Sequence, residues 1–388
     1  MKRLVLVGAG HAHAQVLKDW AAAPLPGVEM CVVSPTALAP YSGRVPGWLA
    51  GRWRFDEIGI DFAALACAAG ARFVHDEVDS LDAARQQLTL RSGATVGYDL
   101  LGLNVGSTLT APTVVGTRVL ALRPLGRLQR AWDSVLNDLD AAPPGGPLRV
   151  TAVGGGAAGA ETLLAVLAQL RRRLPGRTVQ GTLVSRSAAL LPGHAPGAAR
   201  AMAAALARAG VALQLGADFD VGGTARQAGA ADFDTRQAGA ADLLLWATGA
   251  EAQAWQRTSG LAVSGDGFIR IDALLRSVSH PAVYAVGDCA AWTDPLPKSG
   301  VHAVRMGPVL SHNLRAALGA GTAIAHTPQR RTLALLATAD GSAIASYGRW
   351  SAHGRWVARW KDHLDQHFLD RMRAAPYDQA MASSRQNP

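Results

Sequence analysis

The feature that most constrains this chain is a glycine turn placed directly after its first apolar run. Residues Leu4–Val7 are followed by Gly8-Ala9-Gly10-His11-Ala12-His13. A short apolar run that ends in glycines predicts a buried parallel strand turning tightly into a helix. Gly8 permits the turn, and Gly10 lets the backbone approach a pyrophosphate at the helix N-terminus. The N-terminus therefore predicts a nucleotide-binding strand–turn–helix unit.

A second unit of the same kind opens after the proline- and glycine-rich linker at residues 143–147. The strand Leu148–Val153 leads into Gly154-Gly155-Gly156-Ala157-Ala158-Gly159, and a helix is expected over Glu161–Arg172. Glycine occupies all three motif positions here, between a strand and a helix, as the binding mechanism requires. In the first unit the third position is His13 instead.

The residues at the ends of the second strands bear on nucleotide choice. The first unit has Ser34 where many dinucleotide folds have an acid that holds a ribose, and a serine bonds a hydroxyl more weakly. The second unit has Ser185-Arg186, which lacks the charge that repels a 2′-phosphate. NADPH and NADH both stay open, because Arg186 is equally typical of a solvated surface position.

Three further stretches have small residues at strand ends. Tyr98–Ser107 predicts a buried strand with a small-residue turn, Leu243–Gly249 a strand ending in Thr248-Gly249, and Ala282–Val286 a strand ending in Gly287-Asp288. Strands that close on small residues let backbone lie against a flat ligand. The loop Tyr41–Gly47 is expected either to cover a cofactor ring or to be an ordinary connection.

Composition bounds the rest. With 388 residues, 49% of them hydrophobic and 17% charged, the chain is expected to form two or three globular domains. It has no apolar run long enough for a transmembrane helix, and a strand beginning within three residues leaves no room for a signal peptide, so we expect a cytoplasmic protein. The net charge of +9 comes partly from scattered arginines, and we expect no nucleic-acid partner.

The three cysteines are far apart in the sequence. Cys31, Cys67 and Cys289 have neither metal-ligand spacing nor a CxxC pair. We therefore expect no metal site and interpret each as a small buried hydrophobe in a reducing compartment.

The C-terminus predicts an amphipathic helix over Gly348–Met372. Its apolar positions recur every four residues, at Trp356, Trp360, Leu364, Phe368 and Met372, with arginines around them. A stripe this narrow favours packing on the protein or on a second subunit of a homodimer. The alternative is peripheral contact with the inner face of the membrane, because basic helices with tryptophans lie in such interfaces.

Taken together, these motifs resemble the two-dinucleotide-binding-domain flavoproteins, the pyridine nucleotide-disulfide oxidoreductase superfamily. The order of the motifs matches over about residues 1–320: Gly8/Gly10, Gly154/Gly156/Gly159, Thr248-Gly249, then Gly287-Asp288. The resemblance implies an α/β fold with two Rossmann-like domains. An FAD domain over residues 1–115 and 250–320 would be interrupted by an NAD(P)H domain over 116–249, and a small C-terminal α+β segment would cover 321–388.

Within the superfamily, the absence of a CxxC near residue 40 argues against the disulfide reductases. The chain looks like the type II NADH dehydrogenase and sulfide:quinone oxidoreductase branch. It resembles more closely a subfamily found alone or fused to selenide, water dikinase. That likeness rests on Gly10-His11-Ala12-His13, Tyr41-Ser42-Gly43 with Val45-Pro46-Gly47, Arg123-Pro124-Leu125, and Lys298 to Arg305 with Trp360-Lys361-Asp362.

The resemblance also implies the site residues. The helix Gly300–Leu318 should point its N-terminus at the flavin N1/O2 edge, with Lys298 adding a charge unless it is simply solvated. Lys298 and His302 are the catalytic candidates. Contacts with FAD and with NADH or NADPH are expected from Gly8, Gly10, His11, Ala12, Ser34, Pro35, Arg44, Val78, Asn104, Val105, Gly106, Gly154, Gly156, Ala157, Gly159, Glu161, Ser185, Arg186, Thr248, Gly249, Gly287, Asp288, Lys298 and Val301.

The expected activity is electron transfer from NAD(P)H through FAD to a quinone-like or other small acceptor. The stretch His302–Met306 lacks the glutamines of the quinone motif, which leaves the acceptor open. Oxidation of a sulfur or selenium compound is the competing enzyme interpretation, although Cys289 has no evident partner cysteine. A third alternative is a non-catalytic partner in selenium metabolism whose flavin is structural. His11 and His13 are expected to be structural hydrogen-bonders or, less simply, acid–base groups.

Overall fold

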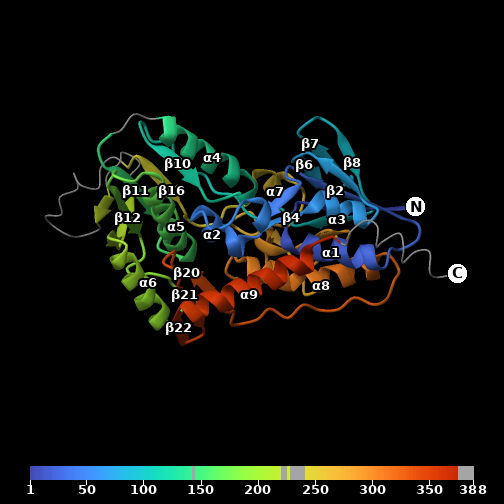
Figure 1. Cartoon of the computed structure of the whole chain (residues 1–388). Coiled ribbons are helices and arrows are strands. Elements are labelled where there is room, and N and C mark those ends of the chain that lie inside the picture. Colours follow the sequence, from blue (N-terminus) through green and yellow to red (C-terminus); the bar gives the residue numbers. More distant parts are fainter. Residues whose placement is uncertain (142–144, 220–224, 228–240, 375–388) are drawn as a thin grey trace.

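The computed structural model describes residues 1–141, 145–219, 225–227 and 241–374. Part of the predicted linker at 143–147 and the end of the C-terminal segment therefore lie outside the described residues. The described chain forms two α/β lobes with a long C-terminal helix running across both (Figure 1).

The first lobe is built on a five-stranded parallel sheet in the order β18-β9-β1-β2-β5. The apolar run predicted at the N-terminus is the central strand β1, whose last four residues are buried. Strand β18 reaches this sheet from beyond the second lobe and pairs with β9. The bounds are β1 Lys2–Val7, β2 Val28–Ser34, β5 Arg72–His75, β9 Leu100–Leu103 and β18 Val283–Ala285.

Helices α1 (His11–Ala22) and α8 (Gly300–Ala317) pack side by side on this sheet. Their crossing is close at Gly307, where a Cβ would come within 3.0 Å of the Gln15 Cβ and 3.3 Å of the Ala12 Cα. Because both helices begin near the carboxyl ends of the strands, their N-termini open toward the same edge of the sheet.

The second lobe repeats the plan with the parallel order β10-β16-β11-β12-β13. Helix α5 starts at Ala157, directly after the glycine turn and four residues before the expected start. The predicted α/β fold with two Rossmann-like sheets is confirmed. The bounds are β10 Arg118–Ala121, α4 Leu125–Ala141, β11 Leu148–Val153, α5 Ala157–Arg173, β12 Val179–Ser185, α6 Pro196–Arg208, β13 Val211–Leu215 and β16 Leu243–Trp246.

Short elements join and flank the two sheets. Helix α2 matters most, because its Trp48 and Leu49 belong to the first lobe's sequence yet pack into the second lobe's core. The short elements are β3 Leu38–Pro40, η1 Ser42–Arg44, α2 Val45–Leu49, η2 Asp56–Ile58, β4 Gly59–Asp61, α3 Phe62–Ala68, β6 Val78–Asp82, β7 Gln87–Leu90, β8 Thr95–Gly97, β14 Ala217–Phe219, β15 Ala225–Gln227, α7 Ala254–Thr258, β17 Ile269–Arg270, η3 Gly287–Cys289 and β19 Ala290–Ala291.

The C-terminal segment is a three-stranded antiparallel sheet followed by α9. Strands β20 (Ala334–Ala337), β21 (Ala343–Tyr347) and β22 (Trp350–Gly354) pair in order, and α9 covers Arg355–Met372. The expectation of a helix from Gly348 is wrong, because residues 350–354 complete the sheet. The sheet packs on the second lobe's core through Leu336 and Ile344, whereas α9 reaches the first lobe's core.

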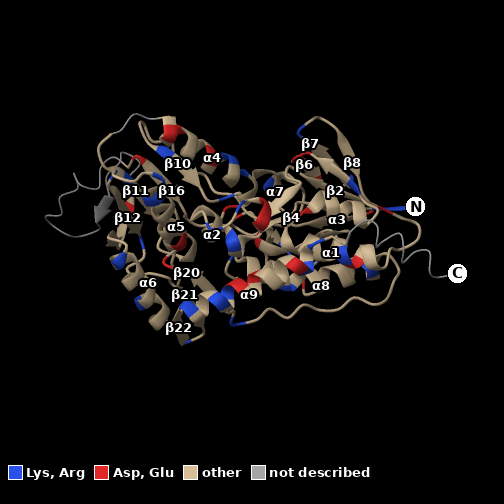
Figure 2. Ribbon diagram, in the orientation of Figure 1, with Lys and Arg blue, Asp and Glu red and all other residues tan. Residues whose placement is uncertain are grey.

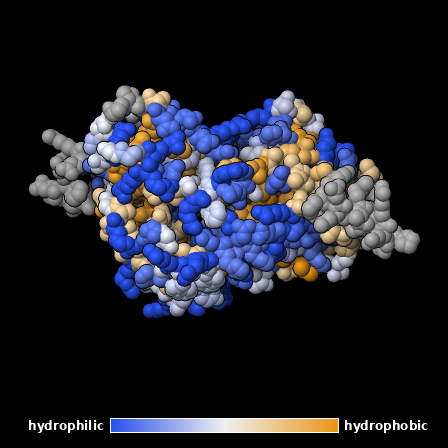
Figure 3. Space-filling view, in the orientation of Figure 1, coloured by the Kyte–Doolittle hydropathy of each residue, from blue (hydrophilic) through white to orange (hydrophobic). Residues whose placement is uncertain are grey.

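The expected apolar stripe of α9 is correct at three of its five positions. The fully buried face consists of Val357, Ala358, Lys361, Asp365, Leu369 and Met372. Of the predicted stripe, Met372 is buried and Trp360 and Phe368 are half-buried against the protein, but Trp356 and Leu364 are 51% and 39% exposed. The inner face contains a charged pair, which hydrophobic periodicity could not indicate. Figure 3 shows mainly hydrophilic side chains over α9, and Figure 2 shows both signs of charge on it.

Helices that could cross a membrane were sought in the described part of the chain. None there combines the necessary length with the necessary apolar character.

Candidate active site

The first glycine turn is fitted around Asn104, the residue after β9. Gly8 has φ +97°, and a Cβ there would come within 2.5 Å of the Asn104 carbonyl oxygen. A Cβ on Gly10 would overlap the Asn104 side-chain Oδ1. Glycine is therefore needed at both positions for close packing against β9, in addition to any approach of a ligand.

The side chain of Asn104 joins the start of one helix to the ends of two strands. Its Oδ1 accepts from the Ala12 backbone N–H at 3.1 Å, and its Nδ2 donates to the Val286 carbonyl at 2.9 Å. Gly287, with φ +70°, leaves space for that amide. Asn104 thus ties the start of α1 to the ends of β9 and β18, so its expected role at the cofactor is to shape the cradle.

His13 fills the third glycine position of the first turn. It is fully buried, and its Nδ1 donates to the Gly8 carbonyl at 2.8 Å. Burial lowers its pKa to about 4, so the ring is neutral. Space for the ring comes from Gly102 on β9, where a Cβ would lie 3.0 Å from His13 Nε2. The structural interpretation of His13 is the one this geometry supports.

The second turn keeps three glycines for three different reasons. Gly154 has φ +126°, and a Cβ there would overlap the Ala247 carbonyl. A Cβ on Gly159 would overlap the Gly154 carbonyl oxygen, so this glycine lets α5 approach the strand. Gly156 caps α5 and has open space where its Cβ would be. That space lies at a helix N-terminus, where a pyrophosphate is favoured.

The two serines at the strand ends are already engaged. Ser34 Oγ donates to the Thr36 carbonyl at 2.9 Å, and Ser185 Oγ accepts from the Ser187 N–H at 3.2 Å. Arg186 is 81% exposed and only 3.7 Å from Asp218, so its guanidinium is free to turn. It is the charged group best placed to meet a nucleotide phosphate at the end of β12.

Other predicted contact residues lie around the first cradle. The Pro35 carbonyl accepts from His75 Nε2 at 2.8 Å, and Val78 begins β6 in a buried position. Gly106, with φ +68°, faces open space, as does Gly249 at the end of the Thr248-Gly249 turn. Val301 donates to the Ser299 side chain, which caps α8. Val105 packs against the first core, and Ala157 against the second.

The N-termini of α1 and α8 converge with the loop after β3. A Cβ on Gly300 would lie 2.7 Å from Ser42 Oγ and 3.9 Å from His11 Cε1. His11 packs edge-on against Tyr41, and its Nε2 is buried with no hydrogen-bond partner among the described residues. Burial lowers the His11 pKa to about 4. An unsatisfied ring nitrogen beside two helix N-termini is suited to a polar ligand atom.

Asp288 faces the same region from the end of β18. Its carboxylate accepts from Ser107 Oγ at 3.2 Å and forms an ion pair with Arg123. Sequence reasoning used Arg123 only as part of a family motif and did not assign it to the site. No local pattern links residues 123 and 288, so the pairing becomes visible only in the fold.

The two catalytic candidates take different positions. Lys298 Nζ donates to the Ala290 carbonyl at 2.6 Å and lies 3.7 Å from the centre of the Phe268 ring. Burial lowers its pKa, so it is not a freely solvated lysine. His302 is 6% exposed on the first turn of α8, and burial lowers its pKa while Asp288 opposes that shift.

A buried charged cluster lies where the second lobe meets α9. Glu161 Oε1 accepts from the Ala337 N–H at 2.6 Å, and its burial raises the pKa to about 7. Lys361 Nζ donates to Asp365 at 2.6 Å and to the Gly43 carbonyl at 2.5 Å. The field of Lys361 opposes the rise at Glu161 and that of Asp365 adds to it. Sequence reasoning assigned Glu161 to the site but gave Lys361 and Asp365 no role in it.

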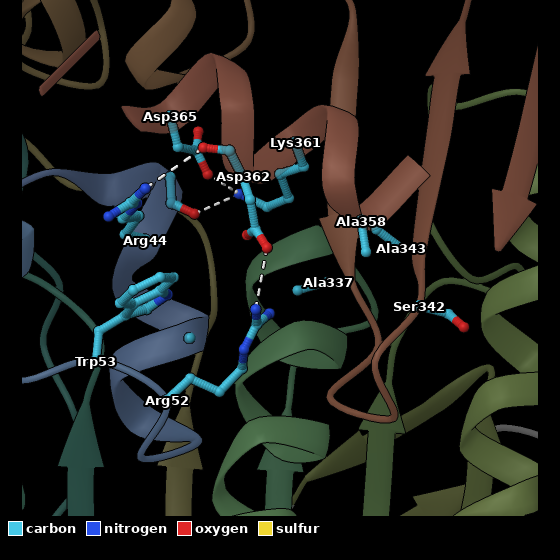
Figure 4. A pocket seen from close by; sticks show the side chains of 12 residues that line it. Arg44, Arg52, Trp53, Ala337, Ser342, Ala343, Ala358, Lys361, Asp362 and Asp365 are labelled. Atoms are coloured by element: carbon cyan, nitrogen blue, oxygen red, sulfur yellow. Dashed lines mark hydrogen bonds and ion pairs between the residues drawn. The ribbon is translucent and has the colours of Figure 1, made fainter. Parts of the chain in front are cut away.

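A pocket opens beside this cluster, between α2, α9 and the β20–β21 turn (Figure 4). Arg44, another predicted cofactor contact, is on its wall. The Arg44 guanidinium donates to Gln366 Oε1 at 2.8 Å and lies 4.4 Å from the Trp53 ring centre. It is therefore held by α9 and Trp53, on the wall of this pocket.

The cysteines differ from expectation in one case. Cys31 and Cys289 are buried free thiols, but Cys67 is exposed on α3, so its interpretation as a buried hydrophobe is wrong. The helix α3 presents only one face to the core, and Cys67 falls on the other. Burial raises the Cys289 pKa to about 11, which disfavours a reactive thiolate. In the part of the chain that is described, His, Cys, Asp and Glu form no cluster suited to a metal ion.

The residues present fit two dinucleotides. Each glycine turn leads into a helix N-terminus, Gly156 and Gly106 face open space, and His11 Nε2 is an unsatisfied buried nitrogen. Gly8, Gly10, Gly154 and Gly159 have close contacts that leave no room for a larger residue. These features are those that pyrophosphate binding requires.

Comparisons with known proteins agree with this arrangement. An NADH dehydrogenase-like protein of Mycobacterium tuberculosis is 28% identical over 309 residues, covering 75% of this chain and 73% of that protein. The fold is similar to NDH2 of Plasmodium falciparum in complex with NADH (TM-score 0.75, 12% identity, 94% and 97% of the two chains). It is also similar to the sulfide:quinone oxidoreductase of Aquifex aeolicus (TM-score 0.74, 15% identity, 98% and 94%).

The family model described as pyridine nucleotide-disulphide oxidoreductase matches residues 2–307, most of the chain. The predicted superfamily is confirmed, and so are FAD and NADH or NADPH as the cofactors. This chain belongs to the pyridine nucleotide-disulphide oxidoreductase family.

Proposed function

We propose that the protein transfers electrons from NAD(P)H through FAD to a small acceptor. The observation that carries the proposal is the pair of glycine cradles, one at each sheet, with Glu161 of α5 meeting α9 between them. The nicotinamide supplies a hydride and the solvent supplies one proton, which together reduce a two-electron acceptor.

We assign FAD to the first lobe, residues 1–115 and 250–320, and NAD(P)H to residues 116–249. The predicted contact residues other than Arg44 are kept in these roles, and Arg123 is added because it pairs with Asp288. Supporting the assignment, β18 brings Asp288 next to Ser107 at the edge of the first sheet. The narrower resemblance to a selenium-linked subfamily and the homodimer remain predictions.

FAD, when bound, supplies hydride uptake and electron release. The protein's part is positioning and charge. The N-terminus of α8, capped by Ser299, directs its positive dipole end toward the place where negative charge would develop. Lys298 stands before this helix with a partly buried ammonium, which adds to the same field.

Glu161 is suited to proton handling because its pKa of about 7 places both protonation states within reach at neutral pH. The carboxyl group lies at the start of the second turn of α5, close to the proposed nicotinamide cradle. Its coupling to Lys361 and Asp365 joins that cradle to the pocket along α9.

We infer a preference for NADPH over NADH. Arg186 at the end of β12 is exposed and held only loosely by Asp218, so it is able to turn onto a 2′-phosphate. Ser185 carries no charge that would repel the phosphate. Replacing Arg186 by Gln should reduce kcat/KM for NADPH more than that for NADH.

Stopped-flow mixing of the flavin-loaded protein with NADPH and NADH tests the proposal. We expect rapid bleaching of the flavin absorbance with either nucleotide, faster with NADPH. The matched control is Gly154→Ala, which overlaps the Ala247 carbonyl in the nicotinamide cradle and leaves the first lobe unchanged. This variant should stay yellow and respond to dithionite but not to NAD(P)H. Wild-type protein whose flavin neither nucleotide reduces would refute the proposal.

A further inference from the structure

The pocket between α2 and α9 has an unusually charged wall. Five of its side chains are Arg44, Arg52, Lys361, Asp362 and Asp365, and Trp53 is the one large ring beside them. The remainder of the lining is glycine, alanine and Ser342 (Figure 4). Such a lining offers little apolar surface to a lipid tail, because an isoprenoid chain binds through branched aliphatic and aromatic contacts.

The charges on this wall do not balance. Asp362 pairs with Arg52 at 3.0 Å, and Asp365 pairs with the buried Lys361 at 2.6 Å. Both carboxylates are thus matched, and the third cation, Arg44, is left over. Within the described residues, Arg44 forms no ion pair.

Arg44 is nevertheless 4% exposed. Its Nη2 donates to two neutral acceptors, Gln366 Oε1 at 2.8 Å and the Asp362 carbonyl at 3.4 Å. Its Nε is buried and has no partner in the described part of the chain. Trp53 offsets some of the charge through its ring face, 4.4 Å away. A buried guanidinium without an anion is costly, so a negatively charged ligand group at this wall would be strongly favoured.

We propose that this small, partly open pocket receives the anionic group of the electron acceptor, with Arg44 as the recognition residue, while the planar part of the acceptor lies at the mouth of the pocket beside Arg52 and Trp53. The inference rests on the proposed function, because that function is what makes the bound ligand an electron acceptor. It names a substrate class, a small planar molecule with a sulfonate or carboxylate, in place of a neutral quinone with a lipid tail. The pocket also adjoins the buried acid, because Ala337 in its lining donates to Glu161.

Binding is tested first without turnover. Isothermal titration of the flavin-loaded protein compares naphthalene-2-sulfonate with the neutral naphthalene-2-sulfonamide. We expect the sulfonate to bind wild type at least about tenfold more tightly, and Arg44→Met to remove that difference while keeping the packing on Trp53. Arg44→Lys should keep part of it. Arg208→Met, an exposed arginine on α6 paired with Asp340, is the matched control and should change nothing.

Turnover is tested second, with 1,4-naphthoquinone and its 2-sulfonate as acceptors. The ratio of variant to wild-type kcat/KM removes the difference in their potentials. We expect Arg44→Met to lower kcat/KM for the sulfonate by about tenfold or more and for the neutral quinone by less than about threefold.

The outcomes separate this inference from the proposed function. If NAD(P)H fails to reduce the flavin, the proposed function falls and the titration still decides whether the pocket binds anions. Equal affinities for sulfonate and sulfonamide in wild type would overturn the inference. So would an Arg44→Met protein that loses its flavin, because Arg44 would then serve the cofactor.

Discussion

Single side chains set how closely the first sheet approaches its helices. His13 replaces the glycine that lets a helix lie near its strand, and Gly102 on the neighbouring strand restores the missing space. The imidazole is then used as a brace, donating to the carbonyl of Gly8. A departure from the glycine pattern is thus compensated about ninety residues away, which a motif search along the sequence does not reveal.

This compensation predicts a coupled pair of substitutions. Gly102→Ala should lower the free energy of unfolding by about 1–3 kcal/mol, because its Cβ meets His13 and Leu6. In a His13→Gly background the same substitution should cost clearly less, since the ring is gone. Urea unfolding of the four proteins in a double-mutant cycle measures the coupling. Strictly additive costs would contradict the contact.

Glu161 predicts a pH-dependent stability. Its folded pKa of about 7 lies above its ordinary value of 4.5, so its contribution is fully present below pH 4.5 and is lost as the pH rises through 7. Glu161→Gln mimics the neutral acid. As the pH rises, its free energy of unfolding should therefore increase relative to that of wild type, by up to about 3 kcal/mol. Thermal unfolding at pH 5 and pH 8.5 tests this. A difference that stays constant with pH would show that the carboxyl group is not shifted.

Among the elements, α9 does the most to define the site. Its first half packs with the C-terminal sheet on the second lobe, and its second half packs on the first lobe. Lys361 and Asp365 lie between these halves, facing Gly43. The helical periodicity of the sequence predicted the helix. The face that the helix buries depends on the Lys361–Asp365 ion pair, because Lys361 donates to the Gly43 carbonyl more than 300 residues upstream.

The orientation of α9 leaves aromatic side chains on the outside and predicts peripheral membrane contact there. Trp350 of β22 and Trp356 of α9 are 49% and 51% exposed, with Arg355 between them in the sequence. We expect the protein to float with anionic vesicles at low salt, and Trp350→Ser/Trp356→Ser to lower partitioning about tenfold. Val115→Ser, at a fully exposed position in the loop before β10, is the control. Wild-type protein that stays at the bottom of the gradient would exclude this contact.

For the molecule as a whole, the two lobes are joined by more than their linkers. Helix α2 belongs to the first lobe in sequence but packs into the core of the second, and α9 spans both. The two glycine cradles therefore stand in a fixed relation, which the proposed hydride transfer between them requires.

This architecture predicts that FAD stabilises the whole chain. At a hundredfold excess over its dissociation constant, FAD should add about 2.7 kcal/mol, and flavin-stripped protein should melt several degrees lower in one transition. Asn104→Ala should abolish the shift, because the Asn104 side chain holds α1 and β18 at the cradle. Calorimetry with and without FAD makes the comparison, and an unchanged melting temperature would count against the first cradle.

Much of the two sheets could be predicted, because the strand–glycine–helix signal is local and steric. The bounds of β11 are the predicted ones. The pocket could not be predicted, since Arg44, Glu161 and Lys361 are brought together by packing between three distant parts of the chain. The contact between Arg44 and α9 could not be predicted for the same reason, because the neighbours of Arg44 in sequence do not reveal that α9 lies over it.

The insertion of the second lobe between β9 and β18 has a consequence for synthesis on the ribosome. The edge of β9 that β18 covers stays unpaired until translation has passed residue 285. At ordinary elongation rates that interval lasts on the order of ten seconds or longer. During this interval the nascent N-terminal half has an unpaired strand edge, which must be protected from aggregation. On the proposed assignment of FAD to the first lobe, the flavin can bind only after the rest of the polypeptide has emerged.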